Sequence, residues 1–409
     1  MKFIFVFLFV FTPILSLFAS KDNLLNENNT IKKPKSLSKL VKKKKTEGFT
    51  YWYYKPDKTG ARAFHNPLQF IIEGGIPGDK VLGNSRFGDG FVELFRKLKN
   101  PIPLINDYGW KKFIYYEFIP HYGDGANWIP NYTWHLFGGG FRTRLMIEYY
   151  HYNNYKYPAL WGWATMYIMH IFNESTQQGN FLKLSSEDKE NGASENDTID
   201  PFPDLLFFDW IGGVIFSYDP INRFMTKYLH LSDWSYQSQL NLATNRILNN
   251  GQIYWMRYQL FDSPFSLNWI SGAKITAPGF SYEYKNDHYL SFGFGLSVNR
   301  ISMDSKGNLV SGSTVYTMGF YYSIADNPIL TATLSMPDYK AMRLHPETKN
   351  EYNMKFYVNL YPTDLIKLWD MNLGLSFAYD RGTFFLGITN ANWPLGFTFG
   401  NHKPEYYGR

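Results

Sequence analysis

The stretch Leu290–Asn299 alternates, residue by residue, between large apolar side chains and small or polar ones. Successive side chains of a β-strand point to opposite faces, so this pattern gives a strand one apolar face and one small or polar face. About ten further segments behave similarly, and each has about the length of a tilted strand that crosses a bilayer. The pattern predicts a mainly β chain that forms an antiparallel transmembrane β-barrel.

The predicted strands lie within residues 232–409, which we interpret as the barrel. They are Trp234–Leu242, Gln252–Leu260, Phe265–Thr276, Phe280–Tyr284, Tyr289–Asn299, Ser313–Ile324, Ile329–Met336, Asn353–Leu360, Met371–Tyr379, Thr383–Thr389 and Pro394–Phe399. Turn residues separate most of them, as in Asn249–Gly251 and Asp380–Gly382. We expect roughly 10 to 14 strands in this barrel.

The amino terminus has the pattern of a secretory signal peptide. Lys2 precedes an apolar run from Phe3 to Phe18, and the small residues Ala19 and Ser20 follow. We predict that residues 1–20 are a cleaved signal peptide, with an uncleaved anchor as the alternative. Together with the strand pattern, this predicts an exported protein of the outer membrane, with outer-membrane lipid as its partner.

Residues 21–47 are polar, rich in Asn and Lys, and without periodicity, which predicts a disordered basic linker. The net charge of +6 comes largely from the lysines between Lys32 and Lys45. The rest of the chain is nearly neutral, so the sequence does not favour nucleic-acid binding. We expect this linker to contact anionic head groups or anionic envelope polymers.

Composition excludes several classes of protein. Aromatic residues make up 19% of the chain while the mean hydropathy is −0.33, which suits strands with one lipid face and one wet face. No segment after the signal reaches roughly 18 uninterrupted apolar residues, so the sequence does not favour a multi-pass helical membrane protein. The chain has no cysteine, which excludes disulfides, thiolate nucleophiles and zinc–thiolate sites.

Residues 48–127 contain three aromatic or β-branched runs, Phe49–Tyr54, Leu68–Glu73 and Phe113–Ile119. We expect them to form N-terminal strands and loops, as part of the barrel or of a small periplasmic subdomain. Residues 128–231 instead show helical spacing of apolar residues. This period predicts a helical insert, packed in or under the barrel lumen.

Within the insert we expect one helix that carries Leu136 to Tyr150 and a second that begins near Pro158. Two further segments, Leu205–Phe216 and Ile221–Leu229, also have helical character. The glycines Gly138–Gly140 and Gly212–Gly213 favour close packing of backbones. Gly138–Gly140 lacks the lysine and the preceding strand of a phosphate-binding loop, and no Gly-x-Ser-x-Gly motif is present.

The helical insert holds the candidate site residues. Glu148 and His151 share one helix face, and His170 and Glu174 share another, because residues three and four apart are neighbours on a helix. With His135 they are the candidate catalytic residues, histidine acting as general base. The candidate ligand-binding residues flank them and are Arg142, Arg144, Asp204 and Asp209.

Three interpretations of these residues stay open. Arg144 is four residues before Glu148 and can pair with it, so a structural polar network is one interpretation. A catalytic or ligand-binding site is the second. Converging imidazoles and carboxylates of the two helices could also form a metal site. The sequence pattern by itself assigns no metal ligand and no cofactor.

The helical insert resembles an uncharacterised bacterial outer-membrane family. The resemblance rests on Asn131–His135, the glycines after it, the helix that ends at His170–Glu174, and Asp200–Leu206 followed by Gly212–Gly213. The resemblance covers roughly a hundred residues and implies an envelope protein with helices associated with a barrel. It implies no activity.

The sequence therefore leaves two functions open. The first is a non-enzymatic outer-membrane barrel with a scaffold, narrow-channel or transport role, because apolar helices in a lumen would close a wide pore. The alternative is a membrane-embedded enzyme that acts on lipid or cell-wall material through the His and Glu residues of the insert.

Overall fold

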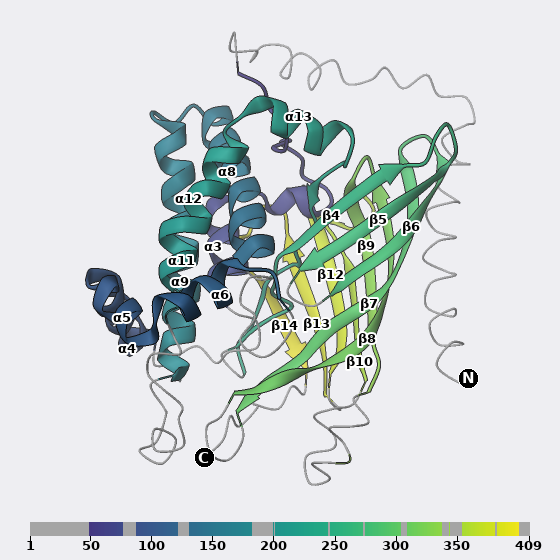
Figure 1. The fold of residues 1–409 in the computed structure, drawn as a ribbon. Helices are drawn as coiled ribbons and strands as arrows, with labels where there is room; N and C mark the ends of the chain where they lie inside the picture. Colours follow the sequence, from purple (N-terminus) through teal and green to yellow (C-terminus); the bar gives the residue numbers. More distant parts are fainter. Residues whose placement is uncertain are drawn as a thin grey trace, which may run out of the picture. The chain divides into compact units, whose positions relative to one another are not determined.

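The computed structural model describes residues 49–76, 87–121, 131–181, 199, 201–243, 246–272, 275–303, 309–337, 343, 354–380 and 383–400 (Figure 1). The chain divides into two units, Met1–Thr50 and Tyr51–Arg409, and the helices and strands of the described residues belong to the second. The predicted signal peptide and basic linker lie outside the described residues.

Helices replace the strands that we expected within residues 48–127. They are η1 (Ala61–Phe64), α3 (Pro67–Gly75), α4 (Phe87–Lys99), α5 (Pro101–Tyr108) and α6 (Trp110–Phe118). Leu68–Glu73 lies inside α3, Phe113–Ile119 falls mainly on α6, and Phe49–Tyr54 forms no strand. The strand prediction was wrong because a short apolar run does not reveal its period. The Asn66 side chain caps α3 and Pro67 occupies its first turn, and both residues favour a helix start.

The helices expected in the insert are present. They are η2 (Asn131–Gly139), α8 (Gly140–Tyr152), α9 (Pro158–Phe181), α11 (Pro201–Pro203), η4 (Asp204–Phe208), α12 (Asp209–Phe216) and α13 (Asp219–Lys227). The glycines do permit close packing, as predicted: a Cβ on Gly140 would lie 2.4 Å from the Gly212 carbonyl oxygen. Among the described helices, none combines the length and the hydropathy that crossing a membrane requires.

In the described part of the chain, the remaining elements form a 14-stranded sheet. Its strands are β1 (Ser232–Asp233), β2 (Gln239–Asn241), β3 (Arg246–Leu248), β4 (Ile253–Gln259), β5 (Phe265–Gly272), β6 (Thr276–Lys285), β7 (His288–Met303), β8 (Leu309–Ile324), β9 (Asn327–Ser335), β10 (Lys355–Leu360), β11 (Lys367–Leu368), β12 (Met371–Asp380), β13 (Thr383–Asn390) and β14 (Gly396–Gly400). Their order is β1-β4-β5-β6-β7-β8-β9-β10-β12-β13-β14-β2-β3, with β11 beside β12.

The strand pairs are antiparallel except β14 with β2, which is parallel. The expectation of a large antiparallel sheet is therefore confirmed in its main feature. The expected closure into a barrel is not confirmed. Among the described residues the path of paired strands has two ends, β1 and β3, and does not close into a barrel. The strand predicted over Phe265–Thr276 is also divided, because β5 ends at Gly272 and β6 begins at Thr276.

The two faces of the sheet differ in polarity. One face is exposed and carries Phe265, Leu267, Trp269, Phe280, Tyr282, Phe294, Leu296, Tyr316, Leu375, Phe384, Leu386, Ile388, Phe397 and Phe399. The other is buried and carries Ser266, Asn268, Ser281, Ser291, Ser297, Thr317, Thr331, Thr333, Asn359, Ser376, Thr389 and Thr398. Over much of its area the sheet thus has large apolar side chains on its outer face and small polar ones on its inner face, as the period of two predicted.

Large aromatic side chains fill the buried side of the sheet near β1. The rings of Trp234 and Trp255 stack with centroids 3.8 Å apart, and Tyr321 of β8 lies 5.7 Å from Trp234. Tyr361, just after β10, donates a hydrogen bond to the Trp234 carbonyl oxygen at 3.1 Å. Since β8 and β10 lie several strands away from β1 in the sheet order, these contacts require a strongly curled sheet.

The helices pack against one stretch of the sheet. Phe141, Leu145 and Phe216 form a core cluster with Leu231 and Tyr254, which lie beside β1 and on β4. Helices α8, α9 and α12 accordingly lie beside the sheet in Figure 1, not in a lumen, and this corrects our expectation. The helices have no space on the buried side of the sheet, because the aromatic cluster near β1 already occupies it.

Candidate functional site

Five predicted site residues come together among the helices, and we call them the histidine–carboxylate cluster. They are His135 of η2, His170 and Glu174 of α9, Asp204 of η4 and Asp209 of α12. All five side chains are buried. The cluster joins elements that are up to 74 residues apart in the sequence.

Asp209 bridges the two imidazoles of the cluster. Its Oδ1 lies 3.1 Å from His135 Nδ1, and its Oδ2 makes a short hydrogen bond with His170 Nδ1. The two rings lie 4.5 Å apart, centroid to centroid. An ionised carboxylate can only accept hydrogen bonds, so both Nδ1 atoms donate to Asp209, and a ring in its neutral form then has its lone pair on Nε2.

A second carboxylate faces the other nitrogen of the His135 ring. His135 Nε2 lies 3.3 Å from Asp204 Oδ2. Donor atoms of His135, Glu174 and Asp204 lie within 4.8 Å of one another, and those of His135, His170 and Asp209 do so as well. Imidazole nitrogens and carboxylate oxygens are ligands for first-row transition metals.

Local backbone geometry positions these side chains. His135 and Asp204 both lie in π-helical turns, which occur rarely and often at functional sites. Gly139 leaves room for the cluster, since a Cβ there would lie 3.0 Å from Asp209 Oδ1 and 3.4 Å from His170 Cε1. The missing side chain therefore lets the cluster approach the backbone of η2 closely.

Burial and mutual contact shift the pKa values in this cluster. Burial lowers the pKa of His170, although Asp209 partly offsets this effect. Burial by itself would raise the pKa of Asp209, but the two imidazoles outweigh it and lower this pKa below its ordinary value. The two directions agree with a neutral His170 that donates to an ionised Asp209.

Glu148 lies in a different environment. It accepts hydrogen bonds from the backbone amides of Trp52 at 3.0 Å, Tyr53 at 2.8 Å and Tyr54 at 2.8 Å. Arg144 Nε donates to the same carboxylate at 2.9 Å, which is the pairing that the sequence spacing indicated. Glu148 therefore fastens the segment before η1 to α8, as a structural residue would.

His151 also lies apart from the histidine–carboxylate cluster. Its Nδ1 is 2.7 Å from the Tyr51 hydroxyl. Arg144 contacts Asp219 at 3.0 Å in addition to Glu148. The sequence grouped the candidate residues incorrectly, because Glu148 and His151 do not converge with the pair on α9.

Arg142 joins three elements at a buried position. Its guanidinium lies 2.9 Å from Asp233 Oδ2 and 3.5 Å from Glu73 Oε2, and it donates to Ser235 Oγ at 2.5 Å. The Phe70 ring lies 4.2 Å from the guanidinium carbon. Sequence reasoning missed Glu73 and Asp233. Recognising the cap of α3 would have placed Glu73 on a helix, whereas no sequence signal indicated Asp233.

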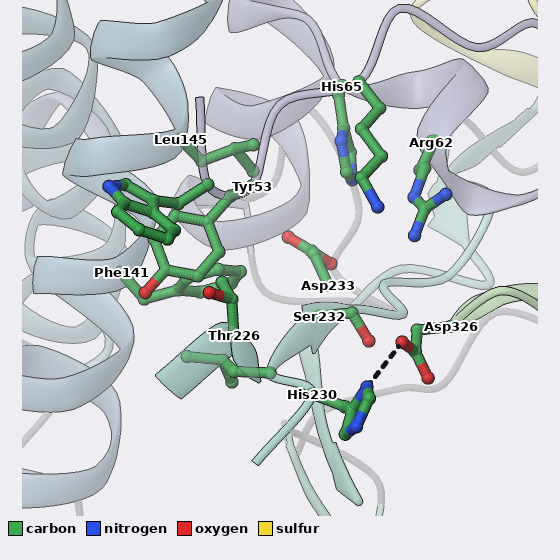
Figure 2. A pocket seen from close by; sticks show the side chains of 13 residues that line it. Tyr53, Arg62, His65, Phe141, Leu145, Thr226, His230, Ser232, Asp233 and Asp326 are labelled. Atoms are coloured by element: carbon green, nitrogen blue, oxygen red, sulfur yellow. Dashed lines mark hydrogen bonds and ion pairs between the residues drawn. The ribbon is translucent and has the colours of Figure 1, made fainter. Parts of the chain in front are cut away.

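Figure 2 shows a cavity between the segment around η1 and β1, with a volume of about 50 Å³. Arg62, His65, Asp233 and Asp326 are among its lining residues, and Asp326 accepts a hydrogen bond from His230 at 3.1 Å. Burial lowers the pKa of His65 to about 4. A space of this size holds water and is too small for an organic substrate.

Comparison with known proteins finds no matching family model, no matching curated protein and no matching solved structure. The function must therefore be inferred from the chemistry of the chain itself.

Proposed function

We propose that this chain is an outer-membrane β-barrel protein of the bacterial envelope, with a scaffold or narrow-channel role. The observation that carries the proposal is the inverted polarity of the sheet. Large apolar side chains cover its exposed face, and serines, threonines and asparagines line much of its buried face beside the aromatic cluster near β1. A strand of an outer-membrane barrel alternates in this way, apolar toward lipid and polar toward the interior.

The exposed face is large for a protein in water. Leu267, Phe294, Leu386 and Phe399 are 52%, 47%, 55% and 62% exposed, and they lie on strands across much of the sheet. Water-soluble proteins rarely leave an extended apolar surface uncovered. Contact with lipid removes the unfavourable free energy of exposing apolar side chains to water, because the bilayer core is itself apolar.

The two ends of the strand path support closure of the wall. The pairs Asp233–Tyr254 and Gln239–Leu248 are separated by equal numbers of residues on both strands, so β1·β4 and β2·β3 share one register. A backbone hydrogen bond from Trp234 N, 2.8 Å long, lies in the gap between them. The other edge of β4 pairs with β5 and that of β2 with β14, so this hairpin would join the two ends of the sheet.

The filled interior favours a scaffold or a narrow channel over a wide pore. Trp234, Trp255 and Tyr321 lie on the buried side of the sheet in mutual ring contact. Gln237 reaches across to Thr389 of β13 and to the Leu360 carbonyl of β10. Wide pores instead keep a water-filled lumen.

The sequence supplies the remaining parts of the proposal. A cleaved signal peptide would direct export, the outer-membrane lipid would be the partner, and the Lys-rich linker would contact anionic envelope polymers. The resemblance of the helical insert to an uncharacterised outer-membrane family is consistent with this location.

Cell fractionation combined with single-cysteine spin labels tests the proposal, since the chain has no cysteine of its own. The mature chain should fractionate with the outer membrane and migrate differently on a gel before and after heating. A spin label at Leu267→Cys should be accessible to lipid-soluble oxygen, and the matched label at Ser266→Cys should not. A soluble periplasmic chain, or equal oxygen accessibility at both positions, would contradict the proposal.

The histidine–carboxylate cluster favours a second candidate, a membrane-embedded enzyme acting on lipid or cell-wall material. His135, His170 and Glu174 lie together there, whereas Glu148 and His151 lie elsewhere. For this function, His135→Gln should abolish an envelope phenotype while the chain still folds. His151→Gln serves as the control and should preserve the phenotype. Equal phenotypes for the two variants would contradict the enzymatic function.

A further inference from the structure

The geometry around His135 Nε2 differs from that around Nδ1. Nδ1 lies 3.1 Å from Asp209, a normal hydrogen-bond length, whereas Nε2 lies 3.3 Å from Asp204, which is longer than a good N–H···O bond. A neutral imidazole has only one N–H. If the ring is neutral and Nδ1 donates to Asp209, the Nε2 lone pair faces an oxygen of Asp204, and a cation between them, a proton or a metal ion, is favourable.

The spacing of 3.3 Å matches a metal ion as that cation. Zn²⁺ binds imidazole nitrogen and carboxylate oxygen at about 2.0–2.2 Å, so two ligands on one tetrahedral ion lie roughly 3.3 Å apart. A proton shared by His135 and Asp204 would bring the two atoms closer than this.

Glu174 distinguishes a metal ion from a proton. Its carboxylate, the Asp204 carboxylate and the His135 imidazole form a buried group whose donor atoms lie within 4.8 Å of one another. A proton bridges two atoms, whereas a metal ion takes three or more. Three protein donors are also the number found in zinc sites that keep one position open.

Asp209 has the geometry of a carboxylate that orients metal ligands. It accepts from Nδ1 of His135 and from Nδ1 of His170. A histidine that binds a metal usually donates its other ring N–H to a carboxylate, which fixes the tautomer and the ring orientation. Gly139 provides the room for this contact.

We propose that His135 Nε2, Glu174 and Asp204 bind one divalent first-row transition-metal ion, and that Asp209 orients the imidazole of His135. The mixed nitrogen and oxygen donors suit Zn²⁺, Fe²⁺ or Mn²⁺ and do not suit Mg²⁺ or Ca²⁺, which take oxygen ligands. The proposal rests on the helices only and holds whether or not the sheet spans a membrane.

The test uses the purified full chain without a histidine tag, loaded with Zn²⁺, dialysed and analysed for bound metal. We expect one zinc ion per folded chain, and a Co²⁺-loaded sample should show visible absorption of a low-symmetry site. Asp204→Asn and Glu174→Gln should lose the ion. Asp209→Asn should keep the site but weaken affinity by about 10–100-fold.

Glu148→Gln is the matched control, because it removes a buried carboxylate of the neighbouring helix α8 that lies outside the site. It should bind zinc with unchanged stoichiometry. Near-ultraviolet circular dichroism reports folding of each variant, and His135→Gln replaces any ligand variant that does not fold. Absence of stoichiometric zinc in the folded wild type, or unchanged zinc affinity in the ligand variants, would overturn the proposal.

Discussion

The sheet and the helices both bury polar side chains, but they satisfy them with different chemistry. In the serine, threonine and asparagine network on the buried side of the sheet the partners are neutral, as where Ser291 donates to Ser281 at 2.8 Å. In the helices the partners are ionisable: Glu148 binds Arg144 at 2.9 Å, and Asp209 binds two imidazoles. Breaking a neutral pair costs little, whereas an ionised group left buried without its partner costs several times more. The helices therefore depend on specific residues far more than the sheet does.

The largest expected effect tests this dependence at Glu148. Glu148→Ala removes one acceptor of Arg144 and the acceptor of three backbone amides, so we expect the free energy of unfolding to fall by about 3–5 kcal/mol. Chemical denaturation in detergent micelles, followed by tryptophan fluorescence, measures this loss.

The matched variant Glu148→Gln keeps the shape and one oxygen acceptor, so its loss should be smaller, about 1–3 kcal/mol. Combining it with Arg144→Gln should recover part of that loss, because the guanidinium that has lost its contact with the Glu148 carboxylate is then removed. A loss below about 1 kcal/mol for Glu148→Ala would show that this carboxylate contributes no more than a neutral residue of the sheet.

The second prediction tests the other side of the comparison, the exposed face of the sheet. If Phe294 faces lipid near the bilayer midplane, Phe294→Arg should cost about 2–4 kcal/mol. If it faces water, the change should stay within about 0.5 kcal/mol. Folding titrations into lipid vesicles provide the measurement.

Phe261→Arg is the control for this prediction. Phe261 lies in the turn between β4 and β5 and is 93% exposed, outside any strand. Its replacement should leave the folding free energy nearly unchanged in both cases. Equal costs at the two positions would contradict a lipid-facing Phe294.

Much of the sheet could be predicted from the sequence because its signal is local. A period of two shows in a single strand, so Met371–Tyr379 was expected where β12 covers Met371–Asp380. Closure and curl are not local properties. They depend on contacts such as that of Tyr361 with Trp234, which are 127 residues apart.

The candidate site was predicted by residue type but not by grouping. Spacing on one helix correctly paired Arg144 with Glu148. It could not show that Asp209 bridges His135 and His170, because this contact depends on how three separate elements pack. The Glu-x-x-His and His-x-x-x-Glu patterns look alike in sequence, yet one supports a chain segment and the other contributes to the histidine–carboxylate cluster.

The third prediction uses the different pKa directions of the two helical clusters. Burial lowers the pKa of His170, so between that value and 6.5 the unfolded chain binds more protons than the folded chain. Stability should therefore fall as the pH drops below about 6.5, by up to about 1.4 kcal/mol for each unit of pKa shift. His170→Asn keeps a donor toward Asp209 and should remove this part of the pH dependence.

Glu148 should change the pH dependence of stability in the opposite direction. Burial raises its pKa above 4.5, although Arg144 and the backbone amides oppose this shift. The folded chain therefore binds more protons than the unfolded chain just above pH 4.5, and this contribution to stability is lost as the pH rises through the folded pKa. Denaturation midpoints of wild type, His170→Asn and Glu148→Gln across this pH range separate the two contributions. If the denaturation midpoints of all three proteins changed with pH in parallel, the assigned pKa shifts would be contradicted.

The smallest expected effect lies in the neutral network of the sheet. Ser281 accepts hydrogen bonds from Asn268 at 3.0 Å and from Ser291 at 2.8 Å, and no charge is involved. Ser281→Ala should cost only about 0.5–1.5 kcal/mol, because Asn268 Nδ2 already has a second acceptor, the Phe292 carbonyl oxygen at 3.4 Å. The same denaturation experiment measures it. A cost as large as that of Glu148→Ala would mean that the sheet interior depends on its exact polar pairs as strongly as the helices do, and the contrast between the two regions would disappear.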